Sequence, residues 1–549
     1  MIRPYFVNIG CRLASAIPNS VNHFSSYLNT PTCNSFCFFP TDDAEIVRIV
    51  TELNNKWSAG YDAIPVNIMK SSIRYIAEPI SRLINSSFSN GIFPNCLKVA
   101  KVCPIYKSGA KNTFTNYRPI SILPSFSKIY EKAVSLRLMT FLEAKCNIID
   151  NQYGFRSKRS TYMALMQMYD KISSAIDNNE YSVGIFIDLS KAFDTLNHKI
   201  LLKKLENYGI RGIALKWFHN YLQDRKQYVF LNGISSTLKS IVCGVPQGSI
   251  LGPLLFIIYI NDIVNCSKLL KFILFADDTN LFYSNSDLAQ LQKIVNSELT
   301  KLSDWFCANK LSLNVVKTNY MLFGYKPIPK TLAQFKLFID GNNLERVSST
   351  KFLGVFVDEK LKWDVHVNYV ASKMSKGLGM LGRVRNLLPF DVLRVLYHTL
   401  IYPYLLYCSI IWAGAAAATL NRLIVLQNRA VRLITSSPFR ASASPIYKQL
   451  NLLPLVDIRR FQQIIFMFKC KHKLLPDCCL QYCPININKP YHTRCSYYFT
   501  APAFRTNIRE QSISVLGPRL WNTLPSDLIN SNNLSHFKRL SMQYFLANY

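Results

Sequence analysis

The sequence predicts an α+β fold with several helices and at least one sheet. Hydrophobic residues make up 49% of the 549 residues, which is enough for sizeable cores and excludes a disordered chain. Up to about residue 360, short apolar runs alternate with stretches of helical periodicity. After residue 365 the pattern is largely helical.

The N-terminal 40 residues show no regular pattern, and the first element is expected just after them. Apolar residues recur at helical spacing from Ile46 to Leu53, and Asp42 with Glu45 can cap the start of that helix. The next expected elements are a helix over 66–88, a strand over 99–106 and a mostly helical region over 118–180 with a turn at Gly154.

Strands and helices alternate in the middle of the chain. The expected strands are 183–188, 227–231, 240–243, 273–276, 280–283 and 351–357. The expected helices are 197–208, 213–222, 252–262 and 286–308.

The charge indicates a polyanionic partner. Lys and Arg number 64 against 32 acids, a formal net charge of +32. Such an excess favours nucleic acid, because each neutralised phosphate releases counterions. From residue 366 onwards there are 22 Lys and Arg but only five acids, so this part is expected to hold phosphate backbone. The alternative is a basic protein that meets only membranes or acidic proteins.

The cysteines and the N-terminus favour an intracellular protein in the nucleus or cytoplasm, and not a secreted one. Fifteen Cys are scattered without a framework, as expected of free thiols, and no secretory signal is recognisable. The first 41 residues lack acids and include Arg3 and Arg12, which weakly suggests a transit peptide. An arbitrary start within a longer ancestral frame is the preferred interpretation.

One uncharged segment is long enough to cross a bilayer. It runs for 22 residues from Thr399 to Leu420 and is interrupted by Pro403. Because it lies in a basic region, a buried helix pair is the preferred interpretation and no membrane partner is expected.

Two adjacent carboxylates, Asp277 and Asp278, lie in the turn of an apolar hairpin. An Asp-Asp pair is ordinary turn chemistry, and that alternative stays open. Beside a core, however, two like charges repel and lose solvation, and a divalent cation reverses that penalty.

Asp188 ends a second apolar strand, Ile185–Asp188. Three aspartates at the ends of neighbouring strands would form a hard oxygen site suited to two Mg²⁺ ions, with Mn²⁺ as a substitute. The alternative is that Asp188 caps a helix that begins at Ser190.

Together these segments resemble the motifs of reverse transcriptases from non-LTR (LINE-like) retrotransposons of the jockey group. Residues 186–194 (FIDLSKAFD), 244–249 (GVPQGS) and 275–278 (FADD) resemble motifs A, B and C in order and spacing. Further matching blocks are 117–121 (YRPIS), 152–156 (QYGFR), 311–314 (LSLN) with Lys317 and Thr318, 352–355 (FLGV) and 517–522 (GPRLWN). The resemblance covers about residues 45–549.

The resemblance implies a right-hand polymerase with fingers, a palm with an antiparallel sheet, a helical thumb and a basic, mostly helical C-terminal region. The implied divisions are an N-terminal remnant over 1–44, fingers and palm over 45–360, thumb over 361–450 and C-terminal region over 451–549. The implied partners are an RNA template, a DNA primer or target, and deoxynucleoside triphosphates.

The resemblance also implies roles for individual residues. Asp188, Asp277 and Asp278, with the Leu189 carbonyl, would hold the two metals. Gln247 would contact the incoming nucleotide and Arg118 the triphosphate. Lys317 would protonate the leaving pyrophosphate, or be an ordinary surface lysine.

Phe193, five residues after Asp188, would lie beside the nucleotide sugar and exclude a 2′-hydroxyl. It therefore argues against the rival interpretation, an RNA-directed RNA polymerase; its simpler role is core packing. Ala276, where retroviral enzymes carry Tyr, is usual for the LINE-like group.

Other activities are not expected. The segment before residue 45 is too short for the endonuclease of such elements, and the acids after 365 are too dispersed for an RNase H site. Zinc is not expected either, because the C-terminal Cys and His spacings fit no usual finger. The residues are Cys470, His472, Cys478, Cys479, Cys483, His492 and Cys495.

The C-terminal aromatic residues Tyr497, Tyr498, Phe499 and Trp521 could stack on bases, or belong to the core. The remaining alternative for the whole chain is an inactive, truncated or domesticated element that only binds nucleic acid.

Overall fold

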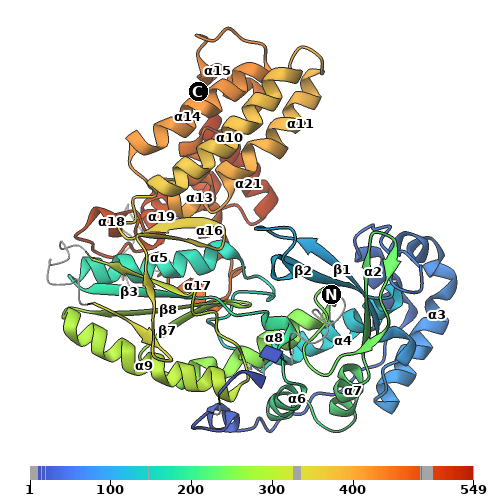
Figure 1. Ribbon diagram of the computed structural model, residues 1–549. Coiled ribbons are helices and arrows are strands. Elements are labelled where there is room, and N and C mark those ends of the chain that lie inside the picture. Colours follow the sequence, from blue (N-terminus) through green and yellow to red (C-terminus); the bar gives the residue numbers. More distant parts are fainter. Residues whose placement is uncertain are drawn as a thin grey trace.

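The computed structural model confirms a mixed α/β architecture (Figure 1). It describes residues 10, 12–13, 15–18, 20–145, 148–324, 335–482, 484, 499–547 and 549. In Figure 1 the sheets lie in the lower half, and the C-terminal helices rise above them.

The larger sheet has five strands in the order β12-β9-β3-β8-β7. Its central strand β3 (Tyr181–Ile187) pairs antiparallel with β8 (Asp278–Asn285) on one side and β9 (Asn319–Phe323) on the other. The edge strands are β7 (Lys271–Phe275), which forms a hairpin with β8, and β12 (Glu345–Arg346).

The central strand β3 is buried on both faces of this sheet, and its residues are accordingly almost all apolar. On one face Val183, Ile185 and Ile187 join a core that includes α8 and α9. On the other face Phe186 joins a core formed with α5 and the C-terminal helices. Gly184 also lies in β3, and a side chain there would meet the Phe282 and Phe323 rings.

The smaller sheet follows the order β2-β1-β4-β5, with β6 also paired to β4. β1 (Val99–Tyr106) pairs antiparallel with β2 (Tyr117–Ile122) and parallel with β4 (Lys226–Leu231). β5 is Ile234–Ser235 and β6 is Lys239–Ser240. The other short strands are β10 (Phe338–Ile339), β11 (Asn342–Asn343), β13 (Ser349–Phe352) and β14 (Val355–Asp358).

The helices before residue 310 agree closely with the expected ones. Asp42 caps α2 as predicted, since its Oδ1 accepts a hydrogen bond from the Glu45 N–H at 2.7 Å. The bounds are α2 Asp43–Glu52, α3 Val66–Asn90, α4 Ser125–Ala144, α5 Thr161–Asp177, α6 His198–Asn207, α7 Gly212–Leu222, α8 Leu251–Ile260 and α9 Leu288–Ala308.

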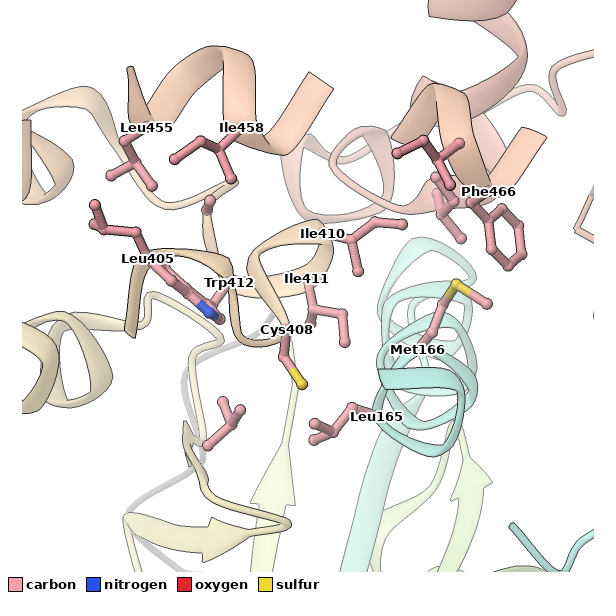
Figure 2. Packing of buried hydrophobic residues seen from close by; sticks show 14 of the residues in the cluster. Leu165, Met166, Leu405, Cys408, Ile410, Ile411, Trp412, Leu455, Ile458 and Phe466 are labelled. Carbon is pink, nitrogen blue, oxygen red and sulfur yellow. The ribbon is translucent and has the colours of Figure 1, made fainter. Parts of the chain in front are cut away.

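The C-terminal helices pack on α5 and share one core with it. Figure 2 shows where these side chains meet, with Leu165 and Met166 of α5 near Cys408, Ile410 and Ile411. The long helices are α10 Asp364–Val384, α11 Phe390–Leu400, α14 Ala417–Ile434, α15 Ala443–Leu450, α16 Leu455–Lys471, α19 Ile513–Asn522 and α21 Leu534–Leu546. The short ones are α12 Tyr402–Leu406, α13 Ser409–Trp412, α17 Asp477–Leu480, α18 Asn507–Glu510 and α20 Ser526–Ile529.

Three expectations about secondary structure are corrected. Residues 118–122 form strand β2 and not helix, because they pair with β1. Residues 351–357 form a hairpin and not one strand, since Leu353 and Gly354 adopt positive φ between β13 and β14. The strand expected over 240–243 ends at Ser240.

The uncharged segment from Thr399 to Leu420 is partly buried, and the expected pair of helices is present as two very short ones. It contains the short helices α12 and α13, and Cys408 between them has a φ of +53°. Among the described residues, no helix combines the length and apolar character needed to cross a membrane. The predicted division near residue 450 stays a prediction; residues on both sides of it share one core.

Gly184 tests the packing of the larger sheet. A methyl group there would lie 2.8 Å from Phe282 Cε1 and 3.1 Å from Phe323 Cε2, both inside a filled core. We expect Gly184→Ala to destabilise the protein by about 1–3 kcal/mol, seen as a lower melting temperature in scanning calorimetry.

The control is Gly379→Ala in α10, where, apart from the adjacent residues and the local helix backbone, no atom of the described residues lies within 4 Å of the added methyl group. Alanine favours the helix, so this variant should melt at or above the wild-type temperature. Equal melting of Gly184→Ala and wild type would contradict the packing described for β3.

Candidate active site

Asp188 directly follows β3 and is held by the segment before β9. Its backbone carbonyl accepts a hydrogen bond from the Asn314 N–H at 2.9 Å, and its Oδ2 accepts one from Asn314 Nδ2 at 2.8 Å. The Ser190 N–H donates to the Ser312 carbonyl at 2.8 Å. The Asp188 carboxylate is therefore oriented by residues more than a hundred positions away in the sequence.

The helix-capping alternative for Asp188 is wrong. The short 3₁₀ helix that follows spans Ala192–Asp194, and the residue before it is Lys191 in the left-handed conformation. Asp188 instead occupies the end of the central strand of the sheet, beside the β7–β8 hairpin.

The Ala276-Asp277 turn of that hairpin is supported from outside the sheet. Ala276 has a φ of +56°, and its N–H donates to Gln152 Oε1 at 3.0 Å. The same oxygen accepts from the Gly154 N–H at 2.9 Å. A side chain at Gly154 would lie 2.4 Å from the Ala276 nitrogen, so only glycine allows this approach.

The three aspartates influence one another electrostatically. Asp277 and Asp278 are exposed at the hairpin tip, yet the surrounding protein excludes enough water that burial raises both pKa values. Repulsion from Asp188 raises the pKa of Asp277 further. Burial, followed by Asp277 and Asp188, raises the pKa of Asp278 to about 6.

A cavity of about 540 Å³ lies in front of these carboxylates. Seven of the eight predicted site residues line it, whereas Asp278 lies in the adjacent turn. The seven are Arg118, Asp188, Leu189, Phe193, Gln247, Asp277 and Lys317. Leu13 of the N-terminal segment also contributes to the wall.

The cavity wall also carries four cationic side chains. Lys107 and Lys191 line it together with Arg118 and Lys317. Lys191 donates to the Tyr117 carbonyl at 3.1 Å. Burial lowers the pKa of Lys191, and repulsion from the other three cations lowers it further. A polyphosphate would relieve this repulsion.

Gln247 is fixed by a buried acid. Its side-chain Nε2 donates to Asp194 Oδ2 at 2.9 Å, and its backbone carbonyl accepts from the Ser121 N–H at 2.8 Å. Burial raises the pKa of Asp194 to about 6. Gly244, with a φ of +81°, is needed because a side chain there would lie 2.7 Å from the Asp194 carbonyl oxygen.

Phe193 packs in the core and also lines the cavity. Its ring centroid lies 4.8 Å from that of Phe256 in α8, and its carbonyl accepts from the Val245 N–H at 2.9 Å. Core packing and a wall beside the substrate are therefore compatible roles for this residue.

Asp188, Asp277 and Asp278 are the residues that could hold a metal. Among the described residues, no group of three or more His, Cys, Asp and Glu side chains already has the geometry of a metal site. The carboxylates nevertheless suit a divalent cation chemically. Burial and repulsion from neighbouring aspartates raise the pKa values of Asp277 and Asp278, and a bound cation would relieve both effects.

The C-terminal candidates have different outcomes. Phe499 and Trp521 are buried, so they belong to the core and cannot stack on bases; Tyr497 and Tyr498 lie outside the described residues. Cys470 and Cys479 are buried free thiols, while Cys483, His492 and Cys495 also lie outside the described residues.

Sequence reasoning gave no role to several residues that shape the site. Asn314, Gln152 and Asp194 lie inside the quoted motif blocks, but their partners are distant in sequence and could not be inferred. Lys191 also lies inside a quoted block, whereas Lys107 carried only the signal of the general basic excess.

Residues 105–357 match the family model described as reverse transcriptase (RNA-dependent DNA polymerase). This segment contains all eight predicted site residues. The chain therefore contains a reverse transcriptase domain, as the resemblance of its motifs indicated.

The relatives are proteins of mobile elements. The probable RNA-directed DNA polymerase from transposon BS of Drosophila melanogaster is 30% identical over 446 residues, 77% of this chain and 48% of the relative. The probable RNA-directed DNA polymerase from transposon X-element of the same species is 26% identical over 430 residues, 76% of this chain and 46% of the relative. The RNA-directed DNA polymerase from mobile element jockey, also of Drosophila melanogaster, is 25% identical over 442 residues, 78% of this chain and 48% of the relative. The chain spans about half the length of these relatives.

The raised pKa of Asp278 predicts pH-dependent metal affinity. Above pH 6 the carboxylate is ionised and can bind a cation; below it, protons compete. With a pKa of about 6, Mn²⁺ affinity measured by calorimetry should be about tenfold weaker at pH 5 than at pH 8. An aspartate with the usual pKa would be ionised at both pH values, so the Mn²⁺ affinity would then differ little between them.

The matched control is Asp278→Asn, which removes the titrating group. Its Mn²⁺ affinity should be lower at pH 8 than that of the wild type and should change less between pH 5 and pH 8 than the wild-type affinity does. Wild-type affinity that is equal at both pH values would contradict the proton competition.

Proposed function

We propose that this chain is the RNA-directed DNA polymerase of a non-LTR retrotransposon, which adds deoxynucleotides to a 3′-hydroxyl on an RNA template. The observation that carries the proposal is the convergence of Asp188 and the Asp277-Asp278 turn on one basic cavity. The family match over 105–357 and the mobile-element relatives support it.

We also propose the right-hand layout. The larger sheet, with Asp188 at its centre, would be the palm. The smaller sheet and the helices around it would form the fingers, interleaved with the palm to about residue 360. The helices over 361–450 would form the thumb, followed by the basic region over 451–549, and both would hold the template–primer backbone.

In this proposal Asp188, Asp277, Asp278 and the Leu189 carbonyl hold two Mg²⁺ ions. When bound, these ions would activate the primer 3′-hydroxyl and neutralise the leaving pyrophosphate. Asn314 keeps the Asp188 carboxylate directed at the site, and Gln152 keeps the Asp277 turn in place.

The substrate nucleotide would be bound by the cavity wall. Arg118 would contact the triphosphate as a fixed cation, and Lys317 would donate the proton that the pyrophosphate requires. Gln247, oriented by Asp194, would contact the nucleotide beside the pairing position. The Phe193 ring would occupy the space of a 2′-hydroxyl.

Primer extension tests the activity. With a poly(rA) template, oligo(dT), Mg²⁺ and dTTP, the wild type should extend the primer and Asp277→Asn should not. Asp277→Asn should still bind template–primer, because a metal ligand matters more for turnover than for affinity. A folded wild type that binds RNA but extends nothing would favour a protein that only binds nucleic acid.

Phe193→Ala tests the choice of sugar. Removing the ring opens space for the 2′-hydroxyl. The ratio of kcat/KM for UTP to that for dTTP should therefore rise by about tenfold or more, because one steric contact contributes ~1–3 kcal/mol to discrimination between two substrates. Phe256→Leu, which loosens the same packing without opening the cavity wall, is the control. An unchanged ratio in Phe193→Ala would exclude the steric role.

A further inference from the structure

A buried arginine with free donors lies beside the catalytic cavity. Arg225, just before β4, is only 1% exposed. Its Nη1 donates to the Tyr221 carbonyl at 3.0 Å, and its guanidinium carbon lies 4.7 Å from the centroid of the Tyr221 ring. Nε and Nη2, however, have no hydrogen-bond partner among the described residues. Buried guanidinium donors are normally satisfied, so these two donors point to a ligand.

The neighbouring charges do not supply that partner. Glu131 is the nearby buried carboxylate, and Arg225 lowers its pKa against the larger effect of burial. Its oxygens, however, accept from the Ile250 and Leu251 N–H groups at 2.6 and 3.2 Å and from Ser127. Glu131 thus balances the charge of Arg225 without bonding to it.

A second buried cation increases the positive charge. Lys98 is 2% exposed, and its Nζ has no partner among the described residues. Burial lowers its pKa, and repulsion from Arg225 lowers it further, against the attraction of the exposed Asp224. An anion near Arg225 would therefore be favoured by both cations.

Arg225 lines a small cavity of about 30 Å³. Pro119 and Gln247 separate it from the catalytic cavity, since both residues line both spaces. Its wall also includes Gly10, Ser121, Asp194, Gln227, Ile241 and residues 243–246. Burial raises the pKa of Asp194 to about 6, so a bound anion would favour the protonated, uncharged form of this acid. The volume suits a single oxygen atom and not a nucleotide.

We propose that this cavity receives a non-bridging phosphate oxygen of the RNA template strand next to the pairing position. This inference rests on the proposed polymerase function. The two free donors of Arg225 form the fork that phosphate recognition uses. The phosphates of the incoming nucleotide are not assigned to this cavity. Their proposed partners, Arg118 and Lys317, line the larger cavity, which Gln247 separates from Arg225.

Equilibrium binding of template–primer, without nucleotide, tests the site apart from catalysis. Arg225→Gln should lower affinity by about tenfold to a hundredfold, as for one charge-assisted hydrogen bond to phosphate. The slope of log K against log salt should decrease by about 0.7, the value for one single-strand phosphate. Lys203→Gln, which removes an exposed, ion-paired charge on α6, should change neither.

A scan with the wild-type protein keeps the test valid if Arg225→Gln fails to fold. Neutral methylphosphonates are placed singly along the RNA template strand around the pairing position. One position should reproduce the affinity loss of Arg225→Gln, and a scan without any loss would overturn the proposal. In a folded Arg225→Gln protein, that same modification should cause no additional loss.

Free pyrophosphate has the same chemistry and is distinguished by product inhibition. The inhibition constant for pyrophosphate should be equal in wild type and Arg225→Gln. A weaker inhibition in the variant, with wild-type template affinity, would assign the cavity to the product and overturn the template assignment. The binding test needs no primer extension, so its result does not depend on the Asp277→Asn experiment. Failure of the template-phosphate proposal can therefore be told apart from failure of the proposed polymerase function.

Discussion

The site depends on holding three carboxylates together at one end of the neighbouring strands β3 and β8 of a buried sheet. Burial and repulsion between the aspartates raise the pKa values of Asp277 and Asp278. The ionised carboxylates are therefore electrostatically unfavourable in this position unless a cation is bound. The antiparallel register of β3 with β8 keeps the three carboxylates together, because it fixes the position of Asp188 relative to the Asp277-Asp278 turn. The hydrophobic cores on both faces of the sheet resist any relaxation of that register.

Close backbone contacts complete the support. Gly154 allows the chain to lie against the Ala276 nitrogen, and Gly244 allows the loop before α8 to lie against Asp194. Both contacts join segments far apart in the sequence. The motif blocks therefore act as one unit, because each positions a residue of another block. Gln152 positions the Ala276-Asp277 turn, Asn314 the Asp188 carboxylate and Asp194 the Gln247 side-chain amide.

Local chemistry explains which features could be predicted from the sequence. The apolar strand before Asp188, the Asp277-Asp278 hairpin and the capped helix after Asp42 follow from short-range pattern, and the structure confirms them. The motif set also indicated the family that the comparison over 105–357 supports. Strand β2 was missed because its residues become a strand only through pairing with β1. The buried Arg225 was missed because an arginine in sequence gives no sign of burial.

The most direct test of the central claim is to locate Mn²⁺ by anomalous scattering in crystals of the protein with template–primer and a non-reactive deoxynucleotide. We expect anomalous peaks in contact with the carboxylates of Asp188 and Asp277, and their loss in the Asp277→Asn protein. Ordered template–primer and nucleotide in the cleft without any peak at these carboxylates would contradict it.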